Sequence, residues 1–345
     1  MSRRAVTLLI AGIGVIVALI VAAVLPVPYV ALLPGPTYNT LGPLNGKPVV
    51  QITGQRTYPT TGHLNMVTVS FIGGPGSSPP FNIFAAIQAW LSPHEAVVPQ
   101  SELFPPGQTQ QQVIKADTEQ MVNSQQTATA AALCLMGTKF TTNDTITSTT
   151  PGSPAAGVLR PGDVIVAVDG QPVNCHESAL SMIQNRRPGQ RVTLTVDRHG
   201  TRHAVILKTV SYQGQPGIGV NVVESFTFPF TVKINIGNVG GPSAGMMFAL
   251  GIIDKLTPGN LSGGRFIAGT GEITVNGTVG PIGGIQQKMV GARAAGATIF
   301  LTPAANCADA VGAVPPGLRL VRVSTLRGAL AALNALRAGR PVPSC

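Results

Sequence analysis

The 345-residue sequence is poor in charged and aromatic side chains, which make up 10% and 5% of it. Disorder needs high charge and low hydrophobicity, whereas 44% of these residues are hydrophobic, so the composition indicates folded domains with a real core. Basic residues outnumber acidic ones by 23 to 13, but they are scattered, and no long basic run interleaves with aromatic residues. We therefore expect no nucleic-acid partner.

The sequence also lacks any C-x-x-C pair and any cysteine–histidine spacing of the zinc-finger kind. We therefore expect no metal site and no cofactor. The even number of cysteines permits disulfides in an exported domain. The favoured pairing joins Cys134 to Cys175 and Cys307 to Cys345, because each pair falls within one apparent structural unit. Four cysteines allow three pairings, however, and buried free thiols are the alternative.

A third absence concerns nucleotides, because no G-x-x-x-x-G-K-[S/T] pattern occurs in the chain. The nearest stretch, Gly42 to Lys47, has the wrong spacing and no Ser or Thr after the lysine. ATP binding at such a phosphate loop is thus excluded.

One long apolar stretch, residues 5–25, contains no charged side chain and is long enough to cross a bilayer. Arg3 and Arg4 precede it, so the positive-inside rule predicts a cytoplasmic tail (1–4) and places the rest of the chain outside. A cleaved signal peptide is the alternative, although the apolar stretch is longer than usual for one. The Pro-rich segment 26–45 is expected to be a stiff, extended linker.

The remainder divides into three parts by pattern. Strand signals at 48–53 and 63–72 are followed by helical patterns at 81–91 and 108–136. A second unit, about 131–210, has strand patterns at 163–168, 191–196 and 203–210 and one helical pattern at 177–185. From 211 to 345 an α/β pattern follows, with expected strands at 217–223, 230–236, 265–268, 273–275 and 297–302, and helices at 243–256, 286–295 and 325–338.

Residues 153–173, SPAAGVLRPGDVIVAVDGQPV, resemble the signature of PDZ domains. The resemblance implies a small, partly open β-barrel with helices, which binds peptide C-termini or internal strands at a sheet edge. Helix 177–185 would line the peptide groove, and residues 137–140 are the only candidate for the Gly-rich loop that holds a carboxylate. The alternative is a PDZ domain that only packs beside its neighbour and shapes access to it.

Residues 238–245, NVGGPSAG, place Ser243 at the expected first turn of an apolar helix. The free N–H groups of a helix N-terminus favour an anion, so they could hold the oxyanion formed when the serine attacks a carbonyl. A plain Gly-rich helix cap or a phosphate-binding loop is the alternative.

A nucleophilic serine needs a base, and all five histidines precede residue 211. The unit 211–345 instead offers three lysines, Lys233, Lys255 and Lys288. Lys255 lies at a helix end, where it suits the helix dipole. Lys288 begins a helix among apolar neighbours, where burial would lower its pKa and leave a neutral amine able to take the serine proton.

Three ordered motifs, GPSAG at 241–245, GTGEI at 269–273 and G-x-V-x-P-I-G-G-I-x-x-K at 277–288, resemble the Lon-type serine-lysine proteases. The resemblance implies that Ser243 is the nucleophile, Lys288 the general base and Thr270 the residue that orients the lysine. It also implies a nearby acid, Glu272, and an oxyanion environment formed by backbone groups of Gly241 and Ala244. An ordinary β-turn threonine at 270 and a solvated charge at 272 are the alternatives.

The overall plan resembles the membrane-anchored, PDZ-containing branch of that family, an α+β fold in which a Lon-like domain (46–130 and 211–345) is split by an inserted PDZ domain (131–210). It implies an ATP-independent serine endopeptidase of the bacterial cytoplasmic membrane that acts on unfolded or membrane-presented proteins and forms a homo-oligomeric ring. The sequence departs from the family at Gly240, where Lon proteases carry Asp, and at Lys233 and Asn235, which replace histidines. A PDZ adaptor on an inactive scaffold, and a nucleotide-binding protein, are the rival hypotheses.

Overall fold

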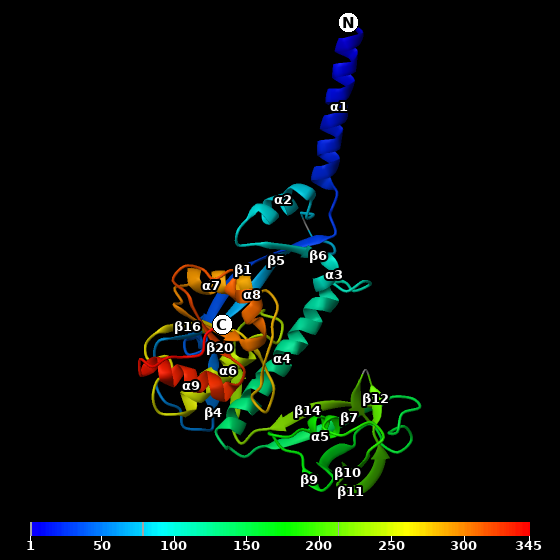
Figure 1. The fold of residues 1–345 in the computed structure, drawn as a ribbon, viewed down its shortest axis with the longest axis vertical. Coiled ribbons are helices and arrows are strands. Elements are labelled where there is room, and N and C mark those ends of the chain that lie inside the picture. The colour runs from blue at the N-terminus through cyan, green and yellow to red at the C-terminus, as the bar shows by residue number, and fades with distance from the viewer. Residues whose placement is uncertain (1, 78, 213) are drawn as a thin grey trace.

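The computed structural model describes residues 2–77, 79–212 and 214–345 (Figure 1). Met1 of the expected tail lies outside this part. Helix α1 (Arg3–Val24) has no buried residue and begins after Ser2, whose Oγ accepts a hydrogen bond from the N–H of Ala5. It is long and apolar enough to cross a membrane, a criterion that a signal sequence near the N-terminus also meets.

The larger sheet has six strands in the order β20-β19-β16-β5-β1-β6. The first four strands run parallel, and β1 pairs antiparallel with both β5 and β6. Since β5 precedes the second sheet in the chain and β16 follows it, this sheet is assembled from both sides of the PDZ-like part. The strands are β20 (Arg319–Val323), β19 (Ile299–Pro303), β16 (Phe266–Gly269), β5 (His63–Gly73), β1 (Tyr29–Asn39) and β6 (Ala96–Pro99).

Helices cover both faces of this sheet, because its strands are apolar on both sides. In β5, Leu64 and Met66 point into the larger core, whereas Val67 points into the core on the opposite face. The larger core is closed by α4 (Gln110–Leu135), α6 (Gly245–Leu256) and α9 (Leu326–Arg337). The other face carries α7 (Ile285–Ala294) and α8 (Cys307–Val311).

The prediction that residues 26–45 form an extended linker is wrong, because β1 (Tyr29–Asn39) lies within this range and is a strand of the larger sheet, between β5 and β6. Its prolines suggested a stiff spacer, but the pairing with β5 shifts register between Pro34 and Thr37. Proline is tolerated in a sheet at such an irregularity, where its missing N–H breaks no ladder bond.

The second sheet, β11-β10-β8-β7-β14 with β9 paired to β8, has its own apolar core and one helix, α5 (Ala179–Gln184). It confirms the expected mixed α+β architecture with a PDZ-like part ahead of the catalytic motifs (Figure 1). Its strands are β7 (Thr141–Thr149), β8 (Val164–Val168), β9 (Gln171–Pro172), β10 (Arg191–Arg198), β11 (Thr201–Lys208) and β14 (Val220–Thr227).

The expected end of the PDZ domain at residue 210 lies inside the second sheet, because β14 also belongs to that sheet. The strand expected at 217–223 forms as β14, but it pairs antiparallel with β7 of the second sheet and not with a strand of the larger sheet. Such pairing joins residues more than 70 positions apart, for example Val220 with Thr149, so no local pattern reveals it.

Two features of the PDZ-like signature have a clear structural role. Asp169 and Gly170 both adopt positive φ, 49° and 80°, as the expected tight turn requires. The carboxylate of Asp163 accepts two hydrogen bonds of 2.7 Å from the guanidinium of Arg198, which holds the pKa of Asp163 below its usual range.

Both favoured disulfides are present. The bond between Cys134 and Cys175 ties the end of α4 to the segment before α5, and the bond between Cys307 and Cys345 ties the C-terminus to α8. The remaining elements are short: α2 (Ile83–Leu91), α3 (Gln100–Leu103), a 3-10 turn (Ala304–Asn306), and the strand pairs β2 (Pro43–Leu44) with β3 (Lys47–Pro48), β4 (Val50–Thr53) with β15 (Thr231–Ile234), β12 (Val210–Tyr212) with β13 (Gln215–Gly217), and β17 (Glu272–Ile273) with β18 (Val279–Gly280).

Gly251 lets α6 approach the end of β1, since a Cβ there would lie 2.7 Å from Oγ1 of the buried Thr40. We expect Gly251→Ala to destabilise the protein by about 1–3 kcal/mol, because overpacking outweighs the better helix propensity of Ala. Thermal melting of the detergent-solubilised chain would measure the change. Gly312→Ala, where a Cβ would meet nothing within 4 Å, is the matched control. Equal melting of the two variants would contradict the proposed close packing.

Candidate active site

Ser243 lies in the turn that leads into α6. Gly241 takes a left-handed conformation, φ 81°, and Ala244 forms the N-cap of the helix. Ser243 is partly exposed, whereas the first residues of α6 are buried in the larger core. The Gly-rich sequence thus turns the chain sharply and presents the serine hydroxyl at a helix N-terminus.

Lys288 comes from the first turn of α7 and is only 4% exposed. The helix begins after Gly284, at φ 66°, and a Cβ on this residue would lie 2.8 Å from Cγ2 of Val69 in β5. Glycine is therefore required for α7 to pack this closely on the sheet. The packing brings Nζ of Lys288 to 2.9 Å from Oγ of Ser243, within hydrogen-bond distance.

Thr270, which directly follows β16, contacts both members of this pair. Its hydroxyl donates a hydrogen bond of 2.9 Å to the backbone carbonyl of Ser243, and its Oγ1 lies 3.3 Å from Nζ of Lys288. Because the threonine proton is used on the carbonyl, Oγ1 is left to accept a hydrogen bond from the lysine. The backbone N–H of Gly271 donates to the same carbonyl at 2.8 Å, which further fixes the serine backbone.

Burial lowers the pKa of Lys288 from 10.5 to about 8, and the negative charge of Glu272 opposes this shift. Removal from water destabilises the charged ammonium, so about a tenth of the amine is neutral at about pH 7 and the fraction grows as the pH rises through 8. The side chain of Glu272 is exposed, and it acts on the lysine through its charge. The expected acid near the site is thus present, and it favours the ammonium form.

The two backbone groups expected to surround an oxyanion differ in availability. The N–H of Gly241 donates to the carbonyl of Asp117 at 2.9 Å, so it is already used. Within the described ranges, the N–H of Ala244 has no acceptor at hydrogen-bond distance. Ala244 is therefore the better placed donor for an oxyanion, and Gly241 serves the shape of the turn.

Sequence analysis missed the contribution of α4 to this turn. Oγ of Ser124 donates to the carbonyl of Pro242 at 3.0 Å, and the carbonyl of Asp117 holds Gly241. A Cβ at Gly240 would lie 2.7 Å from Cβ of Asp117, so a side chain at position 240 would collide with α4. No local motif marks these two α4 positions, because their role depends on packing across more than 100 residues of sequence.

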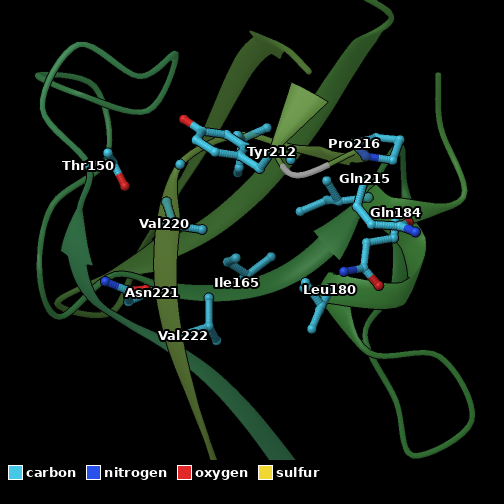
Figure 2. A pocket seen from close by; sticks show the side chains of 15 residues that line it. Thr150, Ile165, Leu180, Gln184, Tyr212, Gln215, Pro216, Val220, Asn221 and Val222 are labelled. Atoms are coloured by element: carbon cyan, nitrogen blue, oxygen red, sulfur yellow. The ribbon is translucent and has the colours of Figure 1, made fainter. Parts of the chain in front are cut away.

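A second candidate site lies in the other sheet, where a cavity of about 550 Å³ opens between α5 and β14 (Figure 2). Its walls combine apolar and polar side chains, and β14 is the last strand of the sheet, so its outer edge is free within the described chain. Its larger apolar side chains include Ile165, Leu180, Ile183, Val220 and Val222.

The glycines at one end of this groove are Gly217 and Gly219, not those of the expected loop 137–140. That expectation is wrong: residues 137–140 follow α4, and Phe140 packs against Phe226 and Phe228. The carbonyl of Gly219 accepts a hydrogen bond from the N–H of Thr150, and in the described part of the chain its own N–H has no acceptor. The pattern Gly-Ile-Gly before an apolar strand was the signal that could have identified the loop.

Comparisons with known proteins match the two parts of the chain in which these sites lie. A family model for the PDZ domain matches residues 134–209, and one for the Lon protease (S16) C-terminal proteolytic domain matches residues 232–330. Lon protease 1 of Sorangium cellulosum is 43% identical over 103 residues, which cover 29% of this chain and 12% of that protein. Lon protease 1 of Bacillus subtilis is 40% identical over 79 residues, 23% of this chain and 10% of its own.

Among solved structures, the PDZ domain of the SdrC-like protein from Listeria innocua is 26% identical, with a TM-score of 0.22. The match covers 23% of this chain and 92% of that domain. The chain spans only about an eighth of the length of the first of these curated relatives. The region that holds Ser243 and Lys288 is therefore similar to the C-terminal proteolytic domain of Lon proteases, and the region ahead of it is similar to PDZ domains.

Proposed function

We propose that the chain is a membrane-anchored serine endopeptidase in which Ser243 is the nucleophile and Lys288 the general base. The observation that carries the proposal is the 2.9 Å approach of a buried lysine amine, with its pKa lowered to about 8, to the hydroxyl of Ser243. A desolvated amine at this distance can take the serine proton, which an ammonium cannot.

In the proposed reaction, neutral Nζ of Lys288 accepts the proton of Ser243 as Oγ attacks the peptide carbonyl. The negative charge that develops on the carbonyl oxygen faces the N-terminus of α6, where the N–H of Ala244 can donate to it. The ammonium then returns its proton to the leaving amine, which leaves an ester on Ser243. Water, deprotonated by Lys288, hydrolyses this ester. Thr270 positions the lysine throughout.

The proposed protease domain consists of residues 26–130 and 228–345, with a PDZ domain in between. Sheet membership supports these limits, because β1 pairs with β5 and β14 pairs with β7. Helix α1 would hold the chain in the cytoplasmic membrane of a bacterium, with the rest outside. Assembly into a homo-oligomeric ring and independence from ATP belong to the same proposal, and rest on the resemblance to the family and on the missing phosphate loop.

We further propose that the groove between α5 and β14 selects substrates by their C-termini. An extended peptide could pair with the free edge of β14, place an apolar side chain between Leu180 and Val222, and direct its carboxylate to Gly217 and Gly219. This groove also favours the rival hypothesis, a peptide-binding adaptor whose protease domain is inactive.

Cleavage of unfolded protein by the full chain in detergent, without ATP, tests the dyad and separates the two hypotheses. We expect Ser243→Ala and Lys288→Ala each to reduce the rate about a thousandfold or more, because neither residue can act alone. Lys233→Ala, which removes an exposed lysine of the same domain, should leave the rate unchanged. A wild-type chain that binds peptides but cleaves nothing would favour the adaptor, and a Lys233→Ala variant as inactive as Lys288→Ala would contradict the dyad.

The pH dependence of kcat/KM should follow the ionisation of Lys288. Because its pKa is lowered to about 8, the neutral base forms as the pH rises through that value, and activity falls below it. We expect kcat/KM to rise about tenfold between about pH 7 and pH 9, since it reports the free enzyme's base. Glu272→Gln should move the midpoint to lower pH, because the charge of Glu272 raises the pKa of the lysine. A midpoint that remains in place in this variant would show that another group titrates.

Peptide binding to the groove should depend on Leu180, which is 58% exposed and can therefore be replaced without opening the core. We expect Leu180→Glu to weaken binding of a fluorescent peptide with a C-terminal Val by about tenfold or more, since a charge replaces apolar contact. Ile206→Glu, the same change at an exposed site on β11 at the other edge of the sheet, is the control. Equal binding of the free-acid and C-terminally amidated peptides would overturn carboxylate recognition.

A further inference from the structure

Helix α2 exposes an apolar stripe that the proposed reaction does not use. Its sequence, IFAAIQAWL, contains no charged residue. One side of the helix packs on the sheet through Ala86 and Ala89, which lie in a small core with Ala31 and Phe81. The opposite side is exposed and carries large apolar side chains at helical spacing, with Gln88 as the one polar residue of the helix; these apolar residues are Ile83, Phe84, Ile87, Trp90 and Leu91.

The most exposed of these residues lie at the C-terminal end of α2. Trp90 is 75% exposed and Leu91 is 71% exposed. Single exposed apolar residues are ordinary, but a contiguous patch of this kind marks a surface that contacts another apolar phase. Burying this patch would remove Phe84 and Trp90 from water, and aromatic side chains such as these contribute a large apolar area.

The position of α2 indicates what that phase is. The helix lies at the base of α1 (Figure 1), and the two are joined by hydrogen bonds. Nδ2 of Asn82 donates to the carbonyl of Ala23 at 2.8 Å, and the N–H of Val27 donates to the carbonyl of Phe81 at 2.8 Å. The apolar stripe is therefore attached to the end of the one described helix that could cross a membrane.

We infer that α2 lies in the membrane surface, with its apolar stripe inserted among the lipid headgroups and upper acyl chains. The inference rests on the proposed anchoring by α1, to whose end the N-terminus of α2 is hydrogen-bonded. Trp and Phe side chains are favoured at this depth of a bilayer. The segment after α2 contributes acidic residues, Glu95 and Glu102, so the attraction is apolar and needs no anionic lipid.

Attachment at two points would restrict how the catalytic domain can tilt. A single helix followed by a short connection leaves the domain free to rotate about the membrane normal and to lean away from it. With α2 also inserted, β1 and β6, which flank the packed side of α2, are held at the membrane surface. The side of the protease that faces the lipid is then fixed.

The sequence provides the probe, because Trp90 is its only tryptophan. The full chain is reconstituted in vesicles of zwitterionic phosphatidylcholine, with and without brominated acyl chains. Insertion predicts that Trp90 emission shifts to shorter wavelength, is mostly quenched by the brominated lipid, and resists quenching by aqueous iodide. Raising the salt concentration should leave these values unchanged, since no charge attraction is involved.

Charged substitutions on the stripe test the same point within the protein. We expect Ile87→Glu with Leu91→Glu to make Trp90 accessible to iodide and insensitive to brominated lipid, while the chain still floats with the vesicles through α1. Gln88→Glu adds charge on the same helix at an exposed polar position and should keep the wild-type quenching.

Each other outcome excludes the inference in a distinct way. A wild-type chain that floats with the vesicles but whose Trp90 is quenched only by iodide leaves the anchor standing and overturns insertion of α2. Protection of Trp90 from both quenchers, increasing with protein density in the vesicles, would assign the stripe to a second copy of the chain instead. A chain that does not float at all would overturn the anchoring proposal and this inference with it.

Discussion

The parallel pairing of β5 with β16 is the contact on which the rest of the structure depends. It joins a strand that precedes the PDZ domain to one that follows it, with Met66 opposite Gly269. Thr270 is the next residue after this pair, and Val69, a little further along β5, lies under Gly284 at the start of the helix that carries Lys288. One strand pairing therefore sets the positions of both the lysine and the threonine that orients it, and a shift of register would separate them from Ser243.

The role proposed for Lys288 as a base requires a lysine that is buried without a close carboxylate. A carboxylate in contact with Nζ would stabilise the ammonium, raise its pKa and remove the base. The protein instead surrounds Nζ with two hydroxyl groups, of Ser243 and Thr270, and leaves Glu272 exposed to water. The hydroxyl of Ser243 can accept from the ammonium or donate to the neutral amine, and Oγ1 of Thr270, whose proton is used on the carbonyl of Ser243, accepts from Nζ in both ionisation states. Burying the charged lysine costs free energy, and the same cost lowers its pKa, so that part of the amine is neutral and can accept a proton near neutral pH.

The sequence predicted correctly those elements that a short local motif determines. The turn of Ser243, the helix of Lys288 and the apolar α1 each follow from a short stretch of sequence. The parts it did not predict depend on partners far along the chain. Prolines made residues 26–45 read as a linker, because the pairing of β1 with β5 and β6 is not visible locally. The same holds for β14, which belongs to the PDZ sheet by its pairing with β7, and for Gly241, whose N–H is taken by Asp117 of α4. The spatial grouping of Ser243, Lys288 and Thr270 was predicted from motifs, whereas their supporting shell required the structure.

The order of parts along the molecule limits how the two sites can work together. Helices α1 and α2 lie at one end, the PDZ sheet lies at the other, and the protease sheet lies between them (Figure 1). The PDZ domain is joined to the protease by two chain crossings, which are held by the Cys134–Cys175 bond and by the packing of Phe140 against Phe226 and Phe228. The groove beside β14 belongs to the second sheet, whereas Ser243 lies at the start of α6 in the larger core. Under the proposed function, the same substrate must extend from the groove to the dyad, which a long unfolded segment can do and a short peptide cannot. In that proposal the groove holds one end of an unfolded chain while the dyad cuts at a distance from it.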